Sequence, residues 1–299
     1  MTAIDPQVAA VIVSWNSGDA LLGTLRSLAE HPPSVPWEAI VVDNASTDGS
    51  PDRVRDEHPD VRLIRNDRNR GLAAANNQGI TASAAAFVLI CNPDIVVQPG
   101  AVDALLDLLH RRPAAAFAIA RLVRPDGSLQ TVAGDLPTLR EALLGRQVQL
   151  RNRAKGEAGF WWDGWAHDAE RRIGHGMEAC FLVRRDALAT IGLQDERFPL
   201  DWEGIDWSAR AAEAGWEIWF SPDATVVHLG GVSLRQAQAA WVVRSHRGMY
   251  RYFAKRRGLA WRPFLAVACT VRAGVKLVGV ALHLADYRAS HPGAQADPP

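Results

Sequence analysis

The chain has 299 residues, and its 48% hydrophobic and 22% charged residues are ordinary for a soluble globular protein of one large domain or one and a half. Acidic and basic residues are equal in number, and the three cysteines are scattered without the spacing of a disulfide framework or of a cysteine metal motif. The N-terminus lacks a charged segment followed by an apolar one, so we expect no secretory signal and a cytoplasmic protein.

The charge is distributed unevenly. Residues 234–288 contain 11 Lys and Arg and one acid, whereas the first 233 residues carry a net charge of −9. The apolar run 264–284 is interrupted by Arg272 and Lys276, which makes it a poor membrane-spanning helix. We expect residues 244–288 to contact the membrane surface as an interfacial helix, peripherally on the inner face of the plasma membrane.

The basic segment has one alternative role. It could pack on the rest of the chain or on a second copy in a homodimer, and the sequence leaves this alternative open. Nucleic acid is not an expected partner, because no recognition motif accompanies the charge.

The first 112 residues alternate between short apolar runs and amphipathic segments. The expected strands are 8–14, 38–42, 61–65 and 86–91. The expected helices are 20–30, a segment opening at 50, 76–83 and 99–109. Repeated units of this kind predict an α/β fold with a mostly parallel, doubly wound sheet and helices on both faces.

The pattern loosens after residue 113. The expected elements are a strand at 116–123, an irregular segment at 134–172, a strand at 176–184, a helix at 205–214, short strands at 216–220 and 225–228, and a helical extension from 236. We therefore expect a main domain over 1–233 and a basic, helical C-terminal extension over 234–299 with a frayed end.

Polar residues follow two of the expected strands. Asp43 and Asn44 come directly after the second strand, and ligands of open α/β sheets bind beyond the carboxyl ends of the strands. Asn92 and Asp94 follow the fourth strand, and oxygen-bearing side chains at this spacing suit Mg²⁺ or Mn²⁺. The alternative for the second pair is an Asn-Pro-Asp turn that only caps the strand.

Taken together, these motifs resemble glycosyltransferase family 2, in its rhamnosyltransferase-like branch. The resemblance lies in SWN, VVDNASTDGS, NRGLAAANNQGI, NPD, GHGMEACFLVRRDAL, IGLQDERF, DWEGIDWSARAAEAGW and PDATVVHLGG, in that order. It covers about residues 8–257. It implies an inverting enzyme of GT-A fold with a nucleotide-binding half over about 8–112 and an acceptor-binding half over about 113–233.

The resemblance also implies roles for individual residues. Those implied for binding the nucleotide sugar are Ser14, Asp43, Asn44, Gly71, Asn77 and Asn92. Asp94 would bind a divalent cation, Mg²⁺ or Mn²⁺, and His228 would be a further ligand of the metal or of the diphosphate. Taken alone, His228 is more often a hydrogen-bonded structural histidine.

The sequence departs from the family at the catalytic base. The family has a Glu-Asp-x-Asp motif at the start of a helix, and the aligned run here is Glu203-Gly204-Ile205-Asp206. Glu203 is our first choice for the base, with Asp206 on the same helical face as the second. The alternatives are that both acids only favour the positive end of the helix, or that the enzyme has lost activity. A base supplied by Asp195 or Asp201 is also open.

The acceptor side is less well defined. Trp161, Trp162 and Trp165 are candidates for an acceptor wall or lid, although tryptophans also fill protein cores. We expect the segment around His175, Gly176 and Glu178 to lie beneath the acceptor.

The implied reaction belongs to polysaccharide and cell-envelope biosynthesis. Its donor would be dTDP-L-rhamnose and its acceptor a glycan or a polyprenyl-linked molecule. Galactofuranosyl, mannosyl or glucosyl donors and a small-molecule acceptor are alternatives. A nucleotidyltransferase would need a glycine-rich basic loop after the first strand, which SWNSGDALL lacks, whereas a catalytically silent nucleotide-sugar-binding protein stays open.

Overall fold

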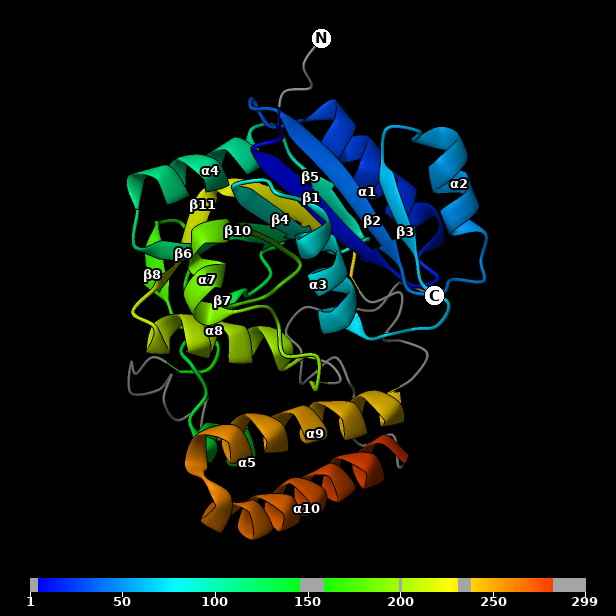
Figure 1. The fold of residues 1–299 in the computed structure, drawn as a ribbon. Coiled ribbons are helices and arrows are strands. Elements are labelled where there is room, and N and C mark those ends of the chain that lie inside the picture. The colour runs from blue at the N-terminus through cyan, green and yellow to red at the C-terminus, as the bar shows by residue number, and fades with distance from the viewer. Residues whose placement is uncertain (1–4, 146–158, 199–200, 231–237, 282–299) are drawn as a thin grey trace.

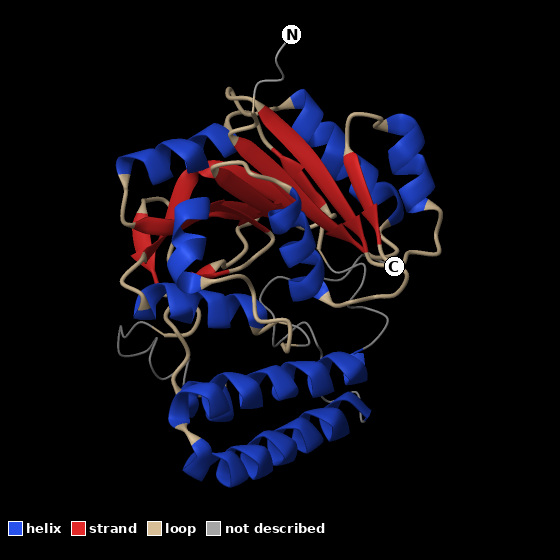
Figure 2. Cartoon of the chain, viewed as in Figure 1, coloured by secondary structure: helices blue, strands red, loops and turns tan. Residues whose placement is uncertain are grey.

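The computed structural model describes residues 5–145, 159–198, 201–230 and 238–281. They form a central sheet with helices packed against both of its faces, and two long helices lie together below it (Figures 1 and 2). The strands of the sheet are β1 (Val8–Ser14), β2 (Trp37–Asp43), β3 (Arg62–Arg65), β4 (Phe87–Cys91), β5 (Ile95–Val97), β6 (Ala115–Val123), β8 (Arg171–Ile173), β10 (Cys180–Arg184) and β11 (Glu217–His228). A small second sheet pairs β7 (Ala133–Gly134) with β9 (His175–Gly176).

The helices alternate with the strands in the first half of the chain. They are α1 (Gly18–Glu30), α2 (Ser50–Glu57), α3 (Leu72–Ala82), α4 (Ala101–Arg111), α5 (Leu139–Leu144), α7 (Leu188–Ile191), α8 (Glu203–Glu213), α9 (Gln238–Arg257) and α10 (Arg262–Ala281). Short 3₁₀ turns, Arg185–Ala187 and Leu259–Trp261, precede α7 and α10.

The sheet is mixed but mostly parallel. Its strand order is β3-β2-β1-β4-β10-β6-β11-β5, with β8 paired to β11. Among the described strands only β5, β8 and β10 run against the others. This confirms the predicted fold class, and it explains why β1 and β4 read as continuous apolar runs: every residue of both strands is buried between helices.

Three details of the strands differ from the sequence prediction. β5 was missed, because three residues so close to the end of β4 look like part of a turn. The two strands expected at 216–220 and 225–228 are one strand, β11, with a shift of register between Ser221 and Thr225. The strand expected at 176–184 is divided, since β9 ends at Gly176 and β10 begins at Cys180.

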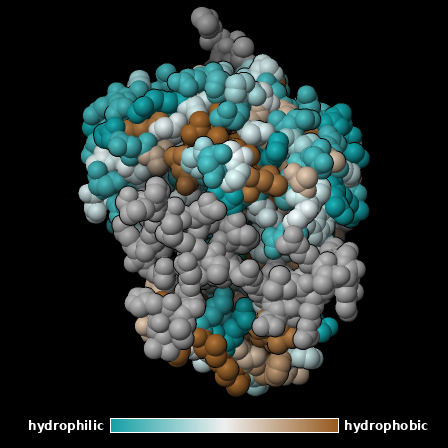
Figure 3. Space-filling model, turned by 180° about the vertical axis from the view of Figure 1, so that it is seen from behind, coloured by the Kyte–Doolittle hydropathy of each residue, from teal (hydrophilic) through white to brown (hydrophobic). Residues whose placement is uncertain are grey.

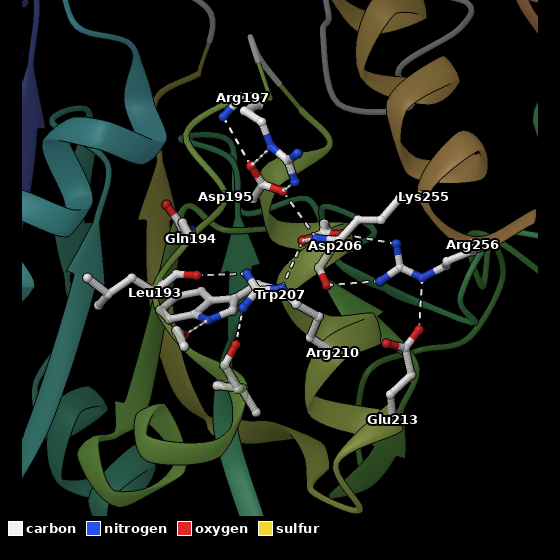
Figure 4. A network of polar contacts seen from close by, with 12 residues as sticks. Leu193, Gln194, Asp195, Arg197, Asp206, Trp207, Arg210, Glu213, Lys255 and Arg256 are labelled. Atoms are coloured by element: carbon white, nitrogen blue, oxygen red, sulfur yellow. Dashed lines mark hydrogen bonds and ion pairs between the residues drawn. The ribbon is translucent and has the colours of Figure 1, made fainter. Parts of the chain in front are cut away.

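The helices of the C-terminal extension are tied to the main sheet through α8. The carboxylate of Asp206, which is fully buried, accepts hydrogen bonds from Arg210 at 2.9 Å, Lys255 at 3.0 Å and Arg256 at 2.9 Å (Figure 4). Lys255 also contacts Asp195 at 3.1 Å. Two of these cations belong to α9, so a buried acid of α8 holds the extension in place.

Apolar packing reinforces this junction. A second hydrophobic cluster joins α8, α9 and α10, and its buried members are Phe198, Trp202, Ala209, Met249, Tyr252, Phe253, Ala254, Leu265 and Cys269. The division of the chain at residue 233 stays a prediction, and the helices beyond it share a core with the residues before it.

Candidate functional site

The carboxyl ends of β1, β2 and β4 lie at one edge of the sheet. Ser14 is paired with Asp43 in the register of β1 and β2, and Ile12 of β1 is paired with Cys91 of β4. The parallel arrangement therefore brings the Asp43–Asn44 motif and the motif that begins at Asn92 to the same edge.

Asp43 and Asn44 shape a loop at this edge. Asp43 is 2% exposed, and its carboxylate accepts a hydrogen bond from the backbone N–H of Ser46 at 3.1 Å. The amide of Asn44 donates to the carbonyl of Gly71 at 3.2 Å and accepts from the N–H of Arg70 at 3.1 Å. Asn44 thus fixes the segment before α3, and its predicted contact with a nucleoside stays a prediction.

Ser14, Gly71 and Asn77 have different environments. The hydroxyl of Ser14 is buried and has no hydrogen-bond partner within the described residues. Gly71 precedes α3 with φ +88°, a backbone conformation that favours glycine. Asn77 donates to the carbonyl of Gln194 at 2.9 Å and to Glu196 at 3.0 Å, so it joins α3 to the loop after α7. These contacts favour a supporting role for Asn77.

Asn92, Asp94 and His228 converge at the sheet edge that also holds the Asp43–Asn44 loop. Nε2 of His228 lies 3.4 Å from Oδ1 of Asp94 and 3.5 Å from Nδ2 of Asn92. The pairing of β11 with β5 produces this arrangement, because His228 is opposite Ile95 in the register. The side chains of Asp94 and His228 are 13% and 11% exposed, so both remain accessible to a ligand.

The separation of the Asp94 and His228 atoms fits two ligands of one divalent cation. Metal–ligand bonds of about 2.1 Å at angles near 90–110° put two ligand atoms about 3.0–3.5 Å apart. Nδ1 of His228 lies 3.0 Å from Oε1 of Gln130, so it donates there and leaves Nε2 free to coordinate. In the described ranges, no group of three or more His, Cys, Asp or Glu side chains could hold a metal ion.

The predicted catalytic acids lie in contrasting environments. Glu203 is 3% exposed, and burial together with the nearby charge of Asp201 raises its pKa to about 7. Asp206 is occupied by its three cationic partners, which favours a structural role. Asp195, an alternative base, is held by Arg197 and Lys255, and the hydrogen bond from Arg197 keeps its pKa below the usual range. Asp201 precedes α8 with φ +69°.

Glu178 is a further acid beside α8. Burial and the charge of Glu203 raise its pKa well above the usual value. Its Oε2 accepts a hydrogen bond from Nε2 of Gln194 at 3.2 Å. Burial and the neighbouring charge of Glu203 therefore both disfavour the ionised form of Glu178.

Comparison with known proteins decides the family of this chain. The sequence model of glycosyl transferase family 2 matches residues 9–192. An N-acetylglucosaminyl-diphospho-decaprenol L-rhamnosyltransferase of Mycobacterium tuberculosis is 31% identical over 284 residues, which cover 88% of each chain. The chain belongs to glycosyltransferase family 2.

Solved structures agree with this fold. A mannosyltransferase of Pyrobaculum calidifontis in complex with GDP-Man and Mn²⁺ is similar with a TM-score of 0.55 and 19% identity, over 93% of this chain and 76% of that one. GalNAc-T7 with UDP, GalNAc and Mn²⁺ is similar with a TM-score of 0.55 and 16% identity, over 76% of this chain and 44% of that one. Both are GT-A enzymes crystallised with Mn²⁺, and at these identities the likeness concerns the fold.

The three tryptophans proposed for the acceptor wall of this family 2 enzyme make contacts inside the protein. Trp162 donates to Asp135 at 3.2 Å, and Trp165 stacks on His167 with ring centroids 4.3 Å apart. Trp161 packs edge-on against His175 at 4.7 Å. These partners favour packing for Trp162 and Trp165, and the acceptor role stays a prediction for all three.

His175 and Gly176 are both closely packed. Burial lowers the pKa of His175 to about 4, so the ring is neutral, and it bonds to the carbonyl of Phe160 at 2.8 Å. A Cβ at Gly176 would lie 2.7 Å from Ile119, so the site has no room for a side chain there.

Two residues that support the site were not singled out from the sequence. Gln130 orients His228, and Gln194 binds Glu178 and is bonded to Asn77. Gln130 belongs to none of the motifs, and its contact with His228 joins segments far apart in the chain. The GLQDER motif was the available signal for Gln194.

The two acids of α8 should respond in opposite directions to loss of charge. Because the folded-state pKa of Glu203 lies above its ordinary 4.5, wild-type stability should fall as pH rises from about 4.5 to about 7. Glu203→Gln should therefore raise the free energy of unfolding at pH 8, by up to about 3 kcal/mol, and change it little at pH 5. Asp206→Asn should lower it at both pH values by about 3–5 kcal/mol, because three cations lose a buried partner.

Urea unfolding of the protein without metal or donor measures both effects. Asp52→Asn is the control, since its ion pairs with Arg55 and Arg65 are exposed and should contribute less than about 1 kcal/mol. A destabilised Glu203→Gln variant at pH 8 would contradict the account of its pKa.

Proposed function

We propose that the protein is an inverting glycosyltransferase that moves L-rhamnose from dTDP-L-rhamnose to a hydroxyl group of a lipid-linked glycan in cell-envelope biosynthesis. Family membership sets the reaction class. The donor is inferred from the likeness to the mycobacterial L-rhamnosyltransferase, which extends over 88% of both chains. The convergence of Asp94 and His228 at the sheet edge that also holds the Asp43 loop carries the proposal, because these two side chains suit a divalent cation that would bind a diphosphate.

Different residues of the site bind different parts of the donor. Ser14, Asp43 and Asn44 bind the nucleoside end of the donor, and Asp94 and His228 face its diphosphate. Asp94 and His228 would hold Mg²⁺ or Mn²⁺, and such an ion would supply positive charge that stabilises the departing diphosphate. The acceptor hydroxyl attacks the sugar from the face opposite the diphosphate and gives its proton to a carboxylate.

A panel of sugar nucleotides tests the donor. The full chain is heated with dTDP-L-rhamnose, UDP-galactofuranose, GDP-mannose or UDP-glucose, each with Mn²⁺, and the melting temperature is recorded. We expect dTDP-L-rhamnose to give the largest rise, because a ligand at 100 times its Kd stabilises the folded state by about 2.7 kcal/mol. Asp94→Ala and His228→Ala should lose most of the rise, whereas Asp126→Ala, in an exposed turn, should keep it.

Release of dTDP in the presence of an N-acetylglucosaminyl-diphospho-polyprenol acceptor separates an enzyme from a silent binding protein. A silent protein would show the rise in melting temperature and no release. A larger rise with another sugar nucleotide would contradict the rhamnose donor, and no rise with any of them would contradict the proposed function.

A lipid-linked acceptor requires the enzyme to reach a membrane, and we propose that α10 docks on it. One side of α10 carries a stripe of exposed apolar residues at helical spacing: Phe264, Val267, Val271, Val275 and Val278. Figure 3 shows hydrophobic surface at the end of the molecule that α9 and α10 form. The opposite side of α10 packs on α9, with Leu265 and Cys269 buried between the helices.

The charge beside the valine stripe suits anionic lipid. Arg257 and Arg262 are exposed near the start of α10, and Arg257 lies over the ring of Trp261 at 5.5 Å. Tryptophan and arginine at the edge of an apolar face are typical of helices that lie in a membrane interface.

Packing distinguishes this docking from a membrane span. In the described residues, Leu259–Ala281 is long and apolar enough to cross a membrane, and 11% of its most apolar window is buried. However, Arg272 donates to the carbonyl of Leu143, and Lys276 lies 5.7 Å from the ring of Trp241. These contacts hold α10 against the protein, so we favour a helix that lies on the membrane.

Co-sedimentation with vesicles tests the docking. Full-length protein should pellet with phosphatidylglycerol-rich vesicles and less with phosphatidylcholine alone. Changing Val271 and Val275 to Asn should reduce binding at least about tenfold, because two apolar side chains that would enter the membrane are lost. The same change at Leu193, which is 40% exposed outside the stripe, should have little effect. Undiminished binding by the stripe variant, or its conversion from a dimer to a monomer, would contradict membrane docking.

A further inference from the structure

Gly204 leaves a space that another acid fills. A Cβ atom built on Gly204 would overlap the Oε1 and Cδ atoms of Glu178 and lie 2.5 Å from its Oε2. Gly204 stands in the first turn of α8 and has no positive φ, so its backbone does not require glycine. The carboxyl group of Glu178 requires it, because it occupies the place where a side chain at position 204 would begin.

Glu178 therefore places a carboxyl group where the side chain of the motif's second acid would begin, although the motif itself has glycine at that position. The family resemblance places an acid at position 204, and here a carboxyl group enters the same place from the segment before β10. We propose that Glu178 is the catalytic base that accepts the proton of the acceptor hydroxyl, an inference that rests on the proposed function.

The chain on both sides of Glu178 is bonded to the diphosphate end of the site. The carbonyl of Ala179 accepts a hydrogen bond from the N–H of Asn92 at 2.8 Å. On the other side, Gln130 donates to the sulfur of Met177 at 3.1 Å and accepts from His228. Glu178 therefore stands at the same sheet edge as the Asn92–Asp94 motif and His228.

Accessibility favours Glu178 over Glu203. Glu203 is 3% exposed, and its Oε2 has no hydrogen-bond partner within the described residues, so an acceptor would have to displace the surrounding packing to reach it. Glu178 is half-buried, and the hydrogen bond from Gln194 stabilises its ionised form.

The acceptor oxygen forms a bond with the anomeric carbon, and its proton passes to the carboxylate of Glu178. The bond between the anomeric carbon and the diphosphate breaks, and its electron pair leaves with the diphosphate.

Substitution of Glu178 and of Glu203, one at a time, tests the proposal on the full-length enzyme. Transfer from dTDP-L-rhamnose with Mn²⁺ is measured as kcat and KM, and donor binding as the rise in melting temperature. Glu178→Gln should lower kcat at least about 100-fold with the donor KM and the melting rise unchanged, because removal of a general base affects the chemical step. Glu203→Gln should lose less.

The double variant distinguishes catalysis from packing. Gly204→Asp alone should be inactive, since its side chain collides with Glu178. Combining it with Glu178→Gly should recover kcat to within about tenfold of wild type, because a carboxyl then returns to the same place from α8. This recovery requires a base at the site and would not follow from a structural role of Glu178.

The outcomes separate this proposal from the proposed function. If the wild type transfers the sugar and Glu178→Gln does so equally well, the assignment of the base is wrong and the proposed function still holds. An inactive Glu203→Gln with an active Glu178→Gln, or a double variant no better than Gly204→Asp, also overturns it. A wild-type protein that neither binds nor transfers any of the four donors overturns the function and this assignment together.

Discussion

At the first turn of α8, the carboxyl group of Glu178 packs directly against the backbone of Gly204, and the arrangement around the site depends on this contact. Glu178 can occupy its position only because Gly204 has no Cβ. Gln194 holds the carboxyl, and Asn77 holds the backbone of Gln194, so the contact is linked to α3. Through Ala179 and Asn92 it is also linked to the edge of β4. The acids of the site are thus positioned by the sheet and by α8 together.

The same helix connects the site to the C-terminal extension. Gly204 and Asp206 are two residues apart on α8, and Asp206 is bonded to Lys255 and Arg256 of α9. Leaving these charges without their partner would be costly in the protein interior. Because α10 packs on α9, the proposed membrane face keeps a fixed orientation relative to the site. A lipid-linked acceptor would therefore approach from a direction that α8 defines.

Much of the fold could be predicted from the sequence, because buried parallel strands appear as apolar runs separated by amphipathic helices. The site was predictable where polar residues directly follow strands, as at Asp43 and Asp94. Contacts between distant segments could not be predicted: Glu178 and Gly204 touch, although 25 residues lie between them in the chain. The gap in the Glu-Asp-x-Asp motif was visible, but only the structure shows which side chain fills it.

The most direct test of the account is a structure of the full-length enzyme with dTDP-L-rhamnose and Mn²⁺. The account predicts that Asp94 and His228 bind the Mn²⁺ ion and that the donor diphosphate lies beside it. It also predicts the carboxyl of Glu178 on the face of the sugar opposite the diphosphate, above Gly204. A metal bound away from Asp94 and His228, or Glu203 facing the sugar with Glu178 turned away, would contradict it.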